Sequence, residues 1–559
     1  IVATKPMATQ QDLSLAYSPG VAAPCLAIAK DPALASRYTG RANLVGVISN
    51  GTAVLGLGKI GALASKPVME GKAVLFKQFS GINVFDIEIE EREIEPFCEA
   101  VARLEPTFGG INLEDIAAPE CFEIERRLRE RMNIPVFHDD QHGTAIVTAA
   151  AIVSGLKVAE KNLSDCHLVA SGAGAAALAC LDLLVSMGLP KEQVIVVDRN
   201  GVVFAGRIEN MDPYKSRFAT QSSLRTLDEA IEGADIFLGL SGPGVLSQDQ
   251  CRKMARAPLI LALANPDPEI WPEDAREARP DALICTGRSD YPNQVNNVLC
   301  FPFIFRGALD VGATEINEAM KIACVNALSA LAEAEPSDLV QQVYAGEPLR
   351  FGPEYLLPKP FDPRLITEVS PAVALAAMQS GVATRPIEDI ESYRRSLSRF
   401  VYKSTALMDP LFERARSQMA RIIYAEGEED RVLEAAQQIV DARLAKPILI
   451  GRRDVILRKI KASSFRFNIE SDIEIVEPAT DSRLEQYAQL YYERMGRRGV
   501  SRARASHVVR SRSSAFAACM LEAGDADGMI CGTVGPFANH LQRVEDIIGK
   551  TRACWIYQP

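Results

Sequence analysis

The chain has 559 residues, of which 48% are hydrophobic and 24% charged, so it holds enough apolar material for several packed cores. Its formal net charge of -11 disfavours general binding to nucleic acid, because phosphate backbones attract clusters of Lys and Arg. Twelve cysteines lie scattered without a C-x-x-C pair, which indicates a reducing cytoplasm. No secretory signal or membrane span is visible, since the most apolar long stretch, residues 170–189, carries Asp182 and a glycine turn.

Residues 1–143 mix short β-branched runs with glycine turns and one clear helical segment. The apolar runs 45–48 and 73–76 predict strands. In residues 120–132, apolar side chains recur at the spacing of one helical face, with charged residues elsewhere. These patterns predict an α/β domain over residues 1–143.

Residues 144–385 repeat the order strand then helix. Compact apolar runs of this kind are typical of fully buried parallel strands, and they lie at 166–170, 194–197, 236–238, 259–263 and 282–285. A long Ala-rich helix is expected over 316–334, and five prolines mark a loop at 348–363. The pattern predicts a Rossmann-like, doubly wound α/β domain.

A charged helical linker is expected over residues 386–420, followed by a third α/β block at 421–559. Strands are predicted at 421–425 and 447–450, with a helix at 433–444 between them. This order predicts a further βαβ unit.

A glycine-rich turn follows the predicted strand 166–170 and opens a helix. It matches the G-x-G-x-x-A fingerprint, in which glycines let the backbone approach a pyrophosphate at a helix N-terminus, with Gly172, Ala173, Gly174, Ala175, Ala176 and Ala177. A tight structural turn would explain the same letters. Asp198, which closes the next strand, favours a dinucleotide and suits NAD, whereas Arg199 beside it could pair with the 2′-phosphate of NADP.

Two acidic clusters occur at residues 112–115 and 138–142. Adjacent carboxylates repel one another and are costly to bury, so clustering them suits a divalent cation between them. Solvated turns and helix caps are the alternative. His138 and His142 have the spacing of a zinc pair, but no third soft ligand is evident, so magnesium or manganese is preferred.

Two further residues are candidates for proton transfer. Lys72 directly precedes the predicted strand 73–76, where apolar neighbours could lower its pKa enough for a general base, although most lysines are surface groups. Tyr17 is more often a core or turn residue in such a context.

Taken together, these segments resemble the malic enzyme family, in the bacterial form that carries a C-terminal phosphotransacetylase-like module. The resemblance is dense over residues 5–331. The matching segments, in chain order, are residues 15–21, 50–58, 70–72, 112–115, 139–145, 264–266 and 294–298.

The resemblance implies oxidative decarboxylation of malate to pyruvate, with NADP favoured over NAD, and Mg²⁺ or Mn²⁺. It implies an acid and base pair of Tyr17 and Lys72, with Asp139 orienting the lysine. The metal ligands would be Glu114, Asp115 and Asp140; Asn265 and Asn297 would hold substrate, and Asn296 would lie next to the nicotinamide. Ala53 stands where long eukaryotic relatives carry arginine, so the substrate carboxylate needs another partner, such as backbone amides of residues 49–52.

The third block resembles the first part of phosphotransacetylase at residues 425–432 and 524–532, and the pattern stops at 551–559. We therefore expect no phosphotransacetylase activity. The resemblance implies a homo-oligomer, with acetyl-CoA as a regulator of the full-length form. A malolactic-type enzyme, a plain oxaloacetate decarboxylase or a silent sensor of dinucleotide or acyl-CoA are the alternatives, the last disfavoured because every implied catalytic residue and metal ligand is present.

Overall fold

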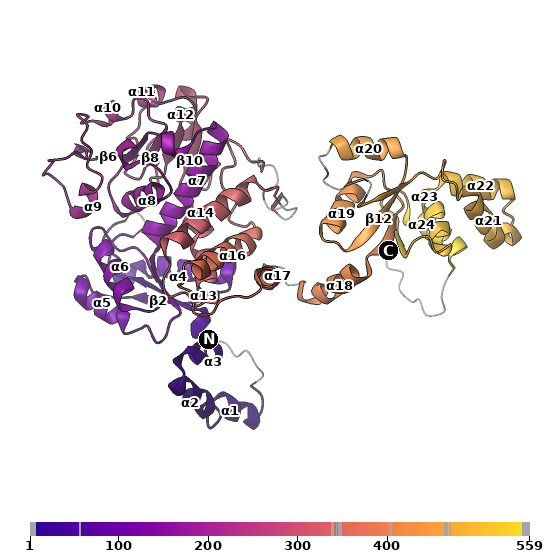
Figure 1. The fold of residues 1–559 in the computed structure, drawn as a ribbon, viewed down its shortest axis with the longest axis horizontal. Helices are drawn as coiled ribbons and strands as arrows, with labels where there is room; N and C mark the ends of the chain where they lie inside the picture. Colours follow the sequence, from indigo (N-terminus) through magenta and orange to yellow (C-terminus); the bar gives the residue numbers. More distant parts are fainter. Residues whose placement is uncertain are drawn as a thin grey trace. The chain divides into compact units, whose positions relative to one another are not determined.

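The computed structural model describes residues 7–549 except 55–56, 337–339, 342–343, 345–348, 402–404, 463–464, 466–467 and 470. The chain forms two compact units, residues 1–401 and 402–559, and both are α/β as predicted (Figure 1). The division falls inside the expected linker: α17 (Ile390–Val401) ends the first unit and α18 (Thr405–Gln418) begins the second. Residues 55–56 and 551–559, which carry part of the expected family pattern and its expected end, lie outside the described residues.

The first sheet of unit 1 has four parallel strands in the order β2-β1-β3-β4. Their bounds are β1 (Leu44–Ser49), β2 (Asn83–Glu88), β3 (Gly110–Leu113) and β4 (Val136–His138). Helices α4 (Ala62–Ser80), α5 (Ile94–Ala102) and α6 (Glu120–Arg131) pack around it. The predicted strand 45–48 and helix 120–132 are confirmed, because one is buried on both faces and the other on one face.

The predicted strand at residues 73–76 is wrong, since these residues lie inside helix α4. The run is apolar and partly β-branched, but the buried positions Met69, Phe76 and Ser80 recur at helical rather than alternating spacing. Tertiary packing therefore overrides the local β preference. Lys72, one turn after Met69 and one turn before Phe76, is placed on the buried face of this helix.

The N-terminal segment packs differently from the rest of unit 1. It forms α1 (Gln10–Ala16), α2 (Ala22–Lys30) and α3 (Ala35–Tyr38), and none of these helices has a buried residue. Figure 1 shows α1 and α2 standing apart from the sheets. Their apolar side chains therefore contribute little to the core of their own chain.

The second sheet of unit 1 has six strands in the order β10-β9-β8-β5-β6-β7, all parallel except the β6–β7 pair. The strands are β5 (Leu168–Ser171), β6 (Val194–Asp198), β7 (Gly201–Val202), β8 (Ile236–Gly239), β9 (Leu259–Ala262) and β10 (Leu283–Thr286). The connecting helices are α8 (Ala175–Ser186), α9 (Pro213–Ser216), α10 (Leu227–Ala230), α11 (Gln248–Lys253) and α12 (Pro272–Ala278). All five predicted apolar runs are confirmed as strands of the expected Rossmann-like sheet.

Helix α7 (Thr144–Ala159) is apolar on all sides. Together with the π-helical turn Asp139–Gly143 before it, the segment is long and apolar enough to cross a membrane. However, 72% of its most apolar window is buried inside the protein, where α7 packs against α8 and α14 (Glu318–Glu333). It is therefore a core helix.

Three aromatic rings pack together where the first sheet and α4 meet the helices that follow the second sheet. Phe305, on α13 (Phe301–Asp310), lies 5.3 Å from the ring of Phe76 and 5.7 Å from that of Phe137, and all three are buried. Helix α13 also packs on α16 (Arg364–Gln379), which packs on α14 and α17. The helix predicted at 316–334 is confirmed as α14.

Unit 2 contains a four-stranded parallel sheet in the order β13-β12-β11-β14. Its strands are β11 (Ala420–Tyr424), β12 (Ala445–Ile450), β13 (Glu474–Val476) and β14 (Gly528–Ile530). Its other helices are α19 (Asp430–Asp441), α20 (Arg453–Ala462), α21 (Leu484–Met495), α22 (Arg502–Ser511), α23 (Ser513–Glu522) and α24 (Phe537–Ile547). The predicted βαβ unit is confirmed as β11, α19 and β12.

The turn between β5 and α8 requires glycine at its first position. Gly172 has a φ of +113°, and a Cβ there would lie 2.3 Å from the carbonyl oxygen of Leu240. Gly174, two residues later, has a negative φ, and a Cβ there would meet no other atom within 4 Å. A side chain at position 172 would therefore collide with the backbone, whereas a side chain at position 174 would not.

We expect Gly172→Ala to lower the free energy of unfolding by about 2 kcal/mol or more, because left-handed strain and a backbone collision add. Gly174→Ala, measured without cofactor, should leave stability within about 0.5 kcal/mol and is the matched control. Thermal and urea unfolding of both variants would check this. Equal stability of the two would show that the turn does not need glycine at position 172.

Candidate active site

The ammonium of Lys72 is held between two carboxylates in the interior of unit 1. Its Nζ lies 2.6 Å from Asp139 Oδ2 and 2.8 Å from Glu114 Oε1, and 4.2 Å from the centre of the Phe301 ring. The Lys72 side chain is 11% exposed and that of Asp139 is fully buried. The structure therefore brings together the expected base and the residue expected to orient it.

The expected lowering of the Lys72 pKa is wrong for this arrangement. Burial by itself lowers the pKa of Lys72, but the charges of Asp139 and Glu114 and their hydrogen bonds raise it above its ordinary value. The expectation of a lowered pKa considered only apolar neighbours; it left out the charge of Asp139, expected to orient the lysine, and the second ion pair with Glu114. The two ion pairs therefore favour the protonated form of Lys72, which must release its proton before it can act as a base.

The expected metal ligands also converge. Glu114 and Asp115 follow β3, and Asp140 follows β4, so parallel strands deliver all three to one edge of the first sheet. Their carboxylate oxygens lie within 4.8 Å of one another. The backbone N–H of Asp115, a residue with a φ of 55°, donates to Asp140 Oδ2 at 2.8 Å and ties the two strand ends together.

The charge balance of this cluster suits a divalent cation. Burial raises the pKa of Glu114 well above its ordinary value, and the nearby Asp140, Asp139 and Asp115 raise it further against the opposing effect of Lys72. An oxygen-rich site of this kind fits Mg²⁺ or Mn²⁺. His138 and His142 do not join the cluster, since among the described residues only Glu114, Asp115 and Asp140 are grouped closely enough to hold an ion.

Of the three expected asparagines, one belongs to the Lys72 site. Asn297 Nδ2 donates to Asp139 Oδ2 at 3.1 Å, and Asn297 Oδ1 accepts from Thr144 Oγ1 at 3.2 Å. Asn296 instead caps its own turn, its Oδ1 accepting from the N–H of Val298. Asn265 is exposed in the loop after β9 and packs against Gly287.

The backbone amides expected to bind the malate carboxylate are in part already used. The N–H of Gly51 donates to Ser49 Oγ at 3.0 Å, and the N–H groups of Thr52 and Ala53 donate to the carbonyl of Asp115 at 3.1 and 2.9 Å. Gly51 and Thr52 are therefore unavailable to a substrate in this arrangement. The two bonds to Asp115 connect the loop after β1 to the metal-ligand loop instead.

Tyr17 is the expected catalytic residue that the structure does not bring to Lys72. It follows the last residue of α1 and is 71% exposed. Nothing in the sequence motif around it signals this exposure.

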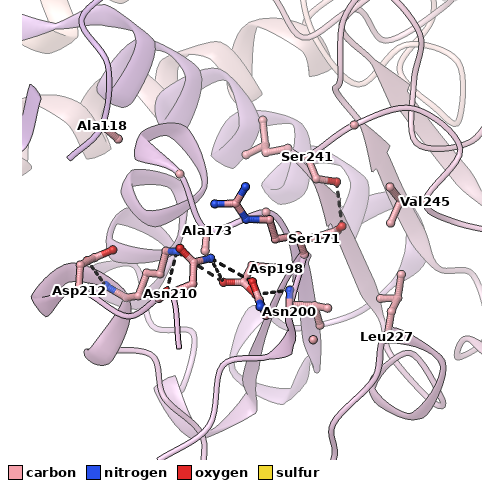
Figure 2. Close-up of a pocket in the computed structure, with 18 of the residues that line it drawn as sticks. Ala118, Ser171, Ala173, Asp198, Asn200, Asn210, Asp212, Leu227, Ser241 and Val245 are labelled. Atoms are coloured by element: carbon pink, nitrogen blue, oxygen red, sulfur yellow. Dashed lines mark hydrogen bonds and ion pairs between the residues drawn. The ribbon is translucent and has the colours of Figure 1, made fainter. Parts of the chain in front are cut away.

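A cavity of about 1020 Å³ opens at the glycine-rich turn, beyond the C-terminal ends of β5, β6 and β8 (Figure 2). Gly172, Ala173 and Gly174 line it, and α8 begins directly after with Ala175, so its first N–H groups are near a site suited to a pyrophosphate. Ala176 and Ala177 continue that helix, with Ala177 buried. Ala118 and Pro119, in the loop between β3 and α6, also line the cavity, only a few residues after Asp115.

Asp198 lies in this cavity but is not free to accept from a ribose. Both of its oxygens accept from Arg207, at 2.7 and 2.6 Å, and one also accepts from Asn210 at 3.1 Å. The N–H of Asn200 donates to it as well, and Figure 2 shows the contacts of Asp198 with Asn200 and Asn210 on one side of the cavity. Although burial alone raises the pKa of Asp198, the hydrogen bonds from Arg207 and Asn200 lower it below its ordinary value.

Arg199 lines the same cavity and is exposed. Within the described part of the chain, no hydrogen bond or ion pair of its guanidinium is seen. Arg207 and Lys215, the second cation within 3.5 Å of Asp198, were missed by the sequence reasoning. They lie 9 and 17 residues after Asp198, where no motif connects them to it.

Comparison with known proteins agrees with this geometry. Residues 1–129 match the N-terminal domain of malic enzyme, 141–344 its NAD binding domain, and 406–557 phosphate acetyl/butaryl transferase. An NADP-dependent malic enzyme of Escherichia coli is 60% identical over 547 residues, which cover 98% of this chain and 72% of that protein. An NAD-dependent malic enzyme of Rhizobium meliloti is 56% identical over 98% of this chain and 71% of that protein.

Solved structures extend the likeness to three dimensions. The crystal structure of a malic enzyme from Pyrococcus horikoshii is 40% identical and matches with a TM-score of 0.67, over 74% of this chain and 93% of that one. A malic enzyme structure from Thermotoga maritima matches with a TM-score of 0.61 at 43% identity, over 67% of this chain and 95% of that one. With the buried lysine, the acidic cluster and the dinucleotide cavity in their expected places, these matches show that the chain belongs to the malic enzyme family.

Proposed function

We propose that this chain oxidises (S)-malate at C2 with NADP and decarboxylates the resulting oxaloacetate to pyruvate and CO₂. The observation that carries the proposal is the buried Lys72, paired with Asp139 and Glu114 beside the cluster of metal-type ligands. A divalent cation held by Glu114, Asp115 and Asp140 would polarise the C2 oxygen and stabilise the negative charge that decarboxylation leaves.

The residues of the chain divide the proton transfers. Once it has released its own proton to water, Lys72 Nζ accepts the proton of the C2 hydroxyl as the hydride leaves C2 for the nicotinamide. Asp139 keeps the lysine in place and balances its charge, and Asn297 donates to the same Asp139 oxygen. Tyr17 would return a proton to C3 of the enol form of pyruvate. Asn265 and Asn297 would hold substrate, and Asn296 would lie next to the nicotinamide.

The cofactor preference is proposed from the state of Asp198. A free carboxylate would bind the ribose hydroxyls of NAD and repel a 2′-phosphate. Here Arg207 neutralises Asp198, and Lys215 adds a second positive charge close by. Arg199 is left exposed at the cavity, where it can pair with the phosphate.

Tyr17 suggests how the site is completed. In its own chain it is exposed, together with Leu15 at 68% and Leu26 at 72% on α1 and α2, and Leu63 on α4 is exposed at 82%. Such apolar surface favours contact with a second copy of the chain. We propose that the enzyme is a cytoplasmic homo-oligomer in which Tyr17 of one copy serves Lys72 of another.

Unit 2 is proposed to have a regulatory role. Its match to phosphate acetyl/butaryl transferase supports binding of acetyl-CoA as an inhibitor. We propose that it does not itself transfer acetyl groups.

Replacing the proposed base or a proposed metal ligand should affect malate oxidation and Mn²⁺ binding differently. We expect Lys72→Ala to lower kcat for malate oxidation at least about 100-fold with little change in NADP affinity, because the lysine handles only the proton. Asp140→Asn should weaken Mn²⁺ binding at least about 10-fold, since it removes a full ligand charge. Lys77→Ala, on the exposed side of α4, is the control.

Formation of reduced nicotinamide, followed by absorbance with malate and Mn²⁺, measures these effects. Wild-type turnover by Lys72→Ala would refute the assigned base. Loss of malate by the unsubstituted chain without accumulation of reduced cofactor would indicate a malolactic-type reaction instead.

Arg199→Ala should raise the KM for NADP about 10-fold or more and leave the KM for NAD nearly unchanged, because only NADP carries the 2′-phosphate. NAD thus serves as the control within one variant. A similar loss with both cofactors, or a higher kcat/KM with NAD in the unsubstituted chain, would contradict the proposed preference.

The shared site can be tested by mixing two inactive variants. Tyr17→Phe and Lys72→Ala, each with its own affinity tag, are co-expressed, and chains carrying both tags are purified. In a two-fold dimer each mixed pair holds one intact site, so about half of the unsubstituted activity per mixed dimer is expected. Mixed dimers as inactive as the parents would show that Tyr17 serves its own chain.

A further inference from the structure

A further group of buried charged residues lies next to the turn that carries Asp139 and Asp140, and the proposed reaction does not use these residues. Glu125 on α6 and Lys321 on α14 are 6% and 4% exposed, and His142 lies between them in the π-helical turn after Asp140. Burial of two charges from different helices is costly unless both are satisfied. The contacts that satisfy these two charges therefore show what the charges do in the structure.

Glu125 holds both ends of the segment that carries Asp139 and Asp140. Its Oε1 accepts from the backbone N–H of His138 at 3.2 Å, and its Oε2 lies 2.9 Å from His142 Nε2. One side chain thus spans the whole bend between β4 and α7.

The positions of the protons follow from the donors available. Lys321 Nζ lies 3.1 Å from His142 Nδ1, and an ammonium can only donate, so Nδ1 must accept. The imidazole is then neutral with its proton on Nε2, which donates to Glu125. Lys321 also donates to Glu318 Oε1 at 2.7 Å, but Glu318 is largely exposed. Glu125 accepts from the N–H of His138 with one oxygen and from His142 with the other, as a carboxylate can.

The same bend is crowded on its inner side. A Cβ at Gly143 would lie 1.9 Å from Asp139 Oδ1, so the Asp139 carboxylate sits directly over the backbone of the turn. A small movement of the turn would therefore shift Asp139 away from Lys72 and Asp140 away from Asp115.

We infer that the hydrogen-bonded chain Lys321, His142 and Glu125 positions the turn that presents Asp139 and Asp140, so that Lys321 and Glu125 are positioning residues for metal binding and catalysis. This inference rests on the proposed metal site. Residues that orient metal ligands from outside the site commonly change metal affinity or activity by about 10–100-fold when replaced.

The test uses the full chain and measures Mn²⁺ binding without substrate, by titration calorimetry or the electron spin resonance of free Mn²⁺. Lys321→Met keeps the length of the side chain and removes its donors, so we expect Mn²⁺ to bind about 10–100-fold more weakly. NADP affinity should change less than about twofold, because the dinucleotide cavity lies elsewhere. Lys321→Arg retains a donor and should recover most of the Mn²⁺ affinity.

Glu318→Gln is the matched control, because it also removes a charge that contacts Lys321 but leaves the bond to His142. Its Mn²⁺ affinity should stay within about twofold of the unsubstituted chain. Glu125→Gln, which keeps the volume of the side chain, is the second variant if Lys321→Met fails to fold, and the same loss of Mn²⁺ affinity is expected from it.

Unchanged Mn²⁺ affinity in Lys321→Met or in Glu125→Gln would overturn the inference, as would an equal loss of Mn²⁺ and NADP affinity, which would indicate a general loss of structure. Asp140→Asn separates this from the proposed function. If Asp140→Asn weakens Mn²⁺ binding and the Lys321 variant does not, only the positioning role fails. If neither weakens it, the metal site itself is wrong.

Discussion

The ion pairs of Lys72 with Asp139 and Glu114 are the interaction on which the arrangement of the site depends. An ammonium that is nearly excluded from water is stable only while opposite charges remain within hydrogen-bond distance. Its partners come from the ends of two adjacent parallel strands, whereas Lys72 comes from a helix that packs against the same sheet. The register of the two strands, the buried face of α4 and the turn before α7 must therefore all be formed correctly for these three charges to meet.

Around this pair the negative charges exceed the positive ones. Four carboxylates, those of Glu114, Asp115, Asp139 and Asp140, lie near one ammonium, and the pKa of Glu114 is raised by burial and by its acidic neighbours. Such an excess is costly in a protein interior unless a cation is bound. The same imbalance links metal binding to proton transfer. A cation bound to Glu114 would reduce the negative charge beside Lys72 and so make the Lys72 proton easier to remove.

The dinucleotide cavity shows how neighbours change what a residue can do. Asp198 stands where an NAD-binding acid is expected, yet Arg207 occupies both of its oxygens. The carboxylate then stabilises the loop after β6 rather than a ribose. The contacts that Asp198 makes therefore say more about its role than its position after β6 does.

Much of the fold was predictable because it is encoded locally. Buried parallel strands are continuous apolar runs, and their helices repeat apolar residues at helical spacing, so nearly every predicted element of both units was confirmed. The run 73–76 was the exception, because a short apolar stretch satisfies either period and only packing against the sheet decides between them. The glycine turn at 172–174 and the acidic clusters could also be found in the sequence, because each is a short run of neighbouring residues.

The sequence by itself determined the fold class, the family and the residue types available for catalysis, because each is carried by short motifs and local periodicity. The resemblance implied Asp139 beside Lys72, but only the tertiary structure decided that Glu114 also pairs with Lys72 and that Lys321 meets His142. Lys72 and Asp139 are 67 residues apart, His142 and Lys321 are 179 apart, and neither pairing has a signal in the spacing. The direction of the Lys72 pKa shift and the occupation of Asp198 follow from such contacts, since electrostatic effects depend on distance through space and on burial rather than on separation along the chain. The exposure of Tyr17 follows from the lack of buried residues on α1, which only the folded chain shows.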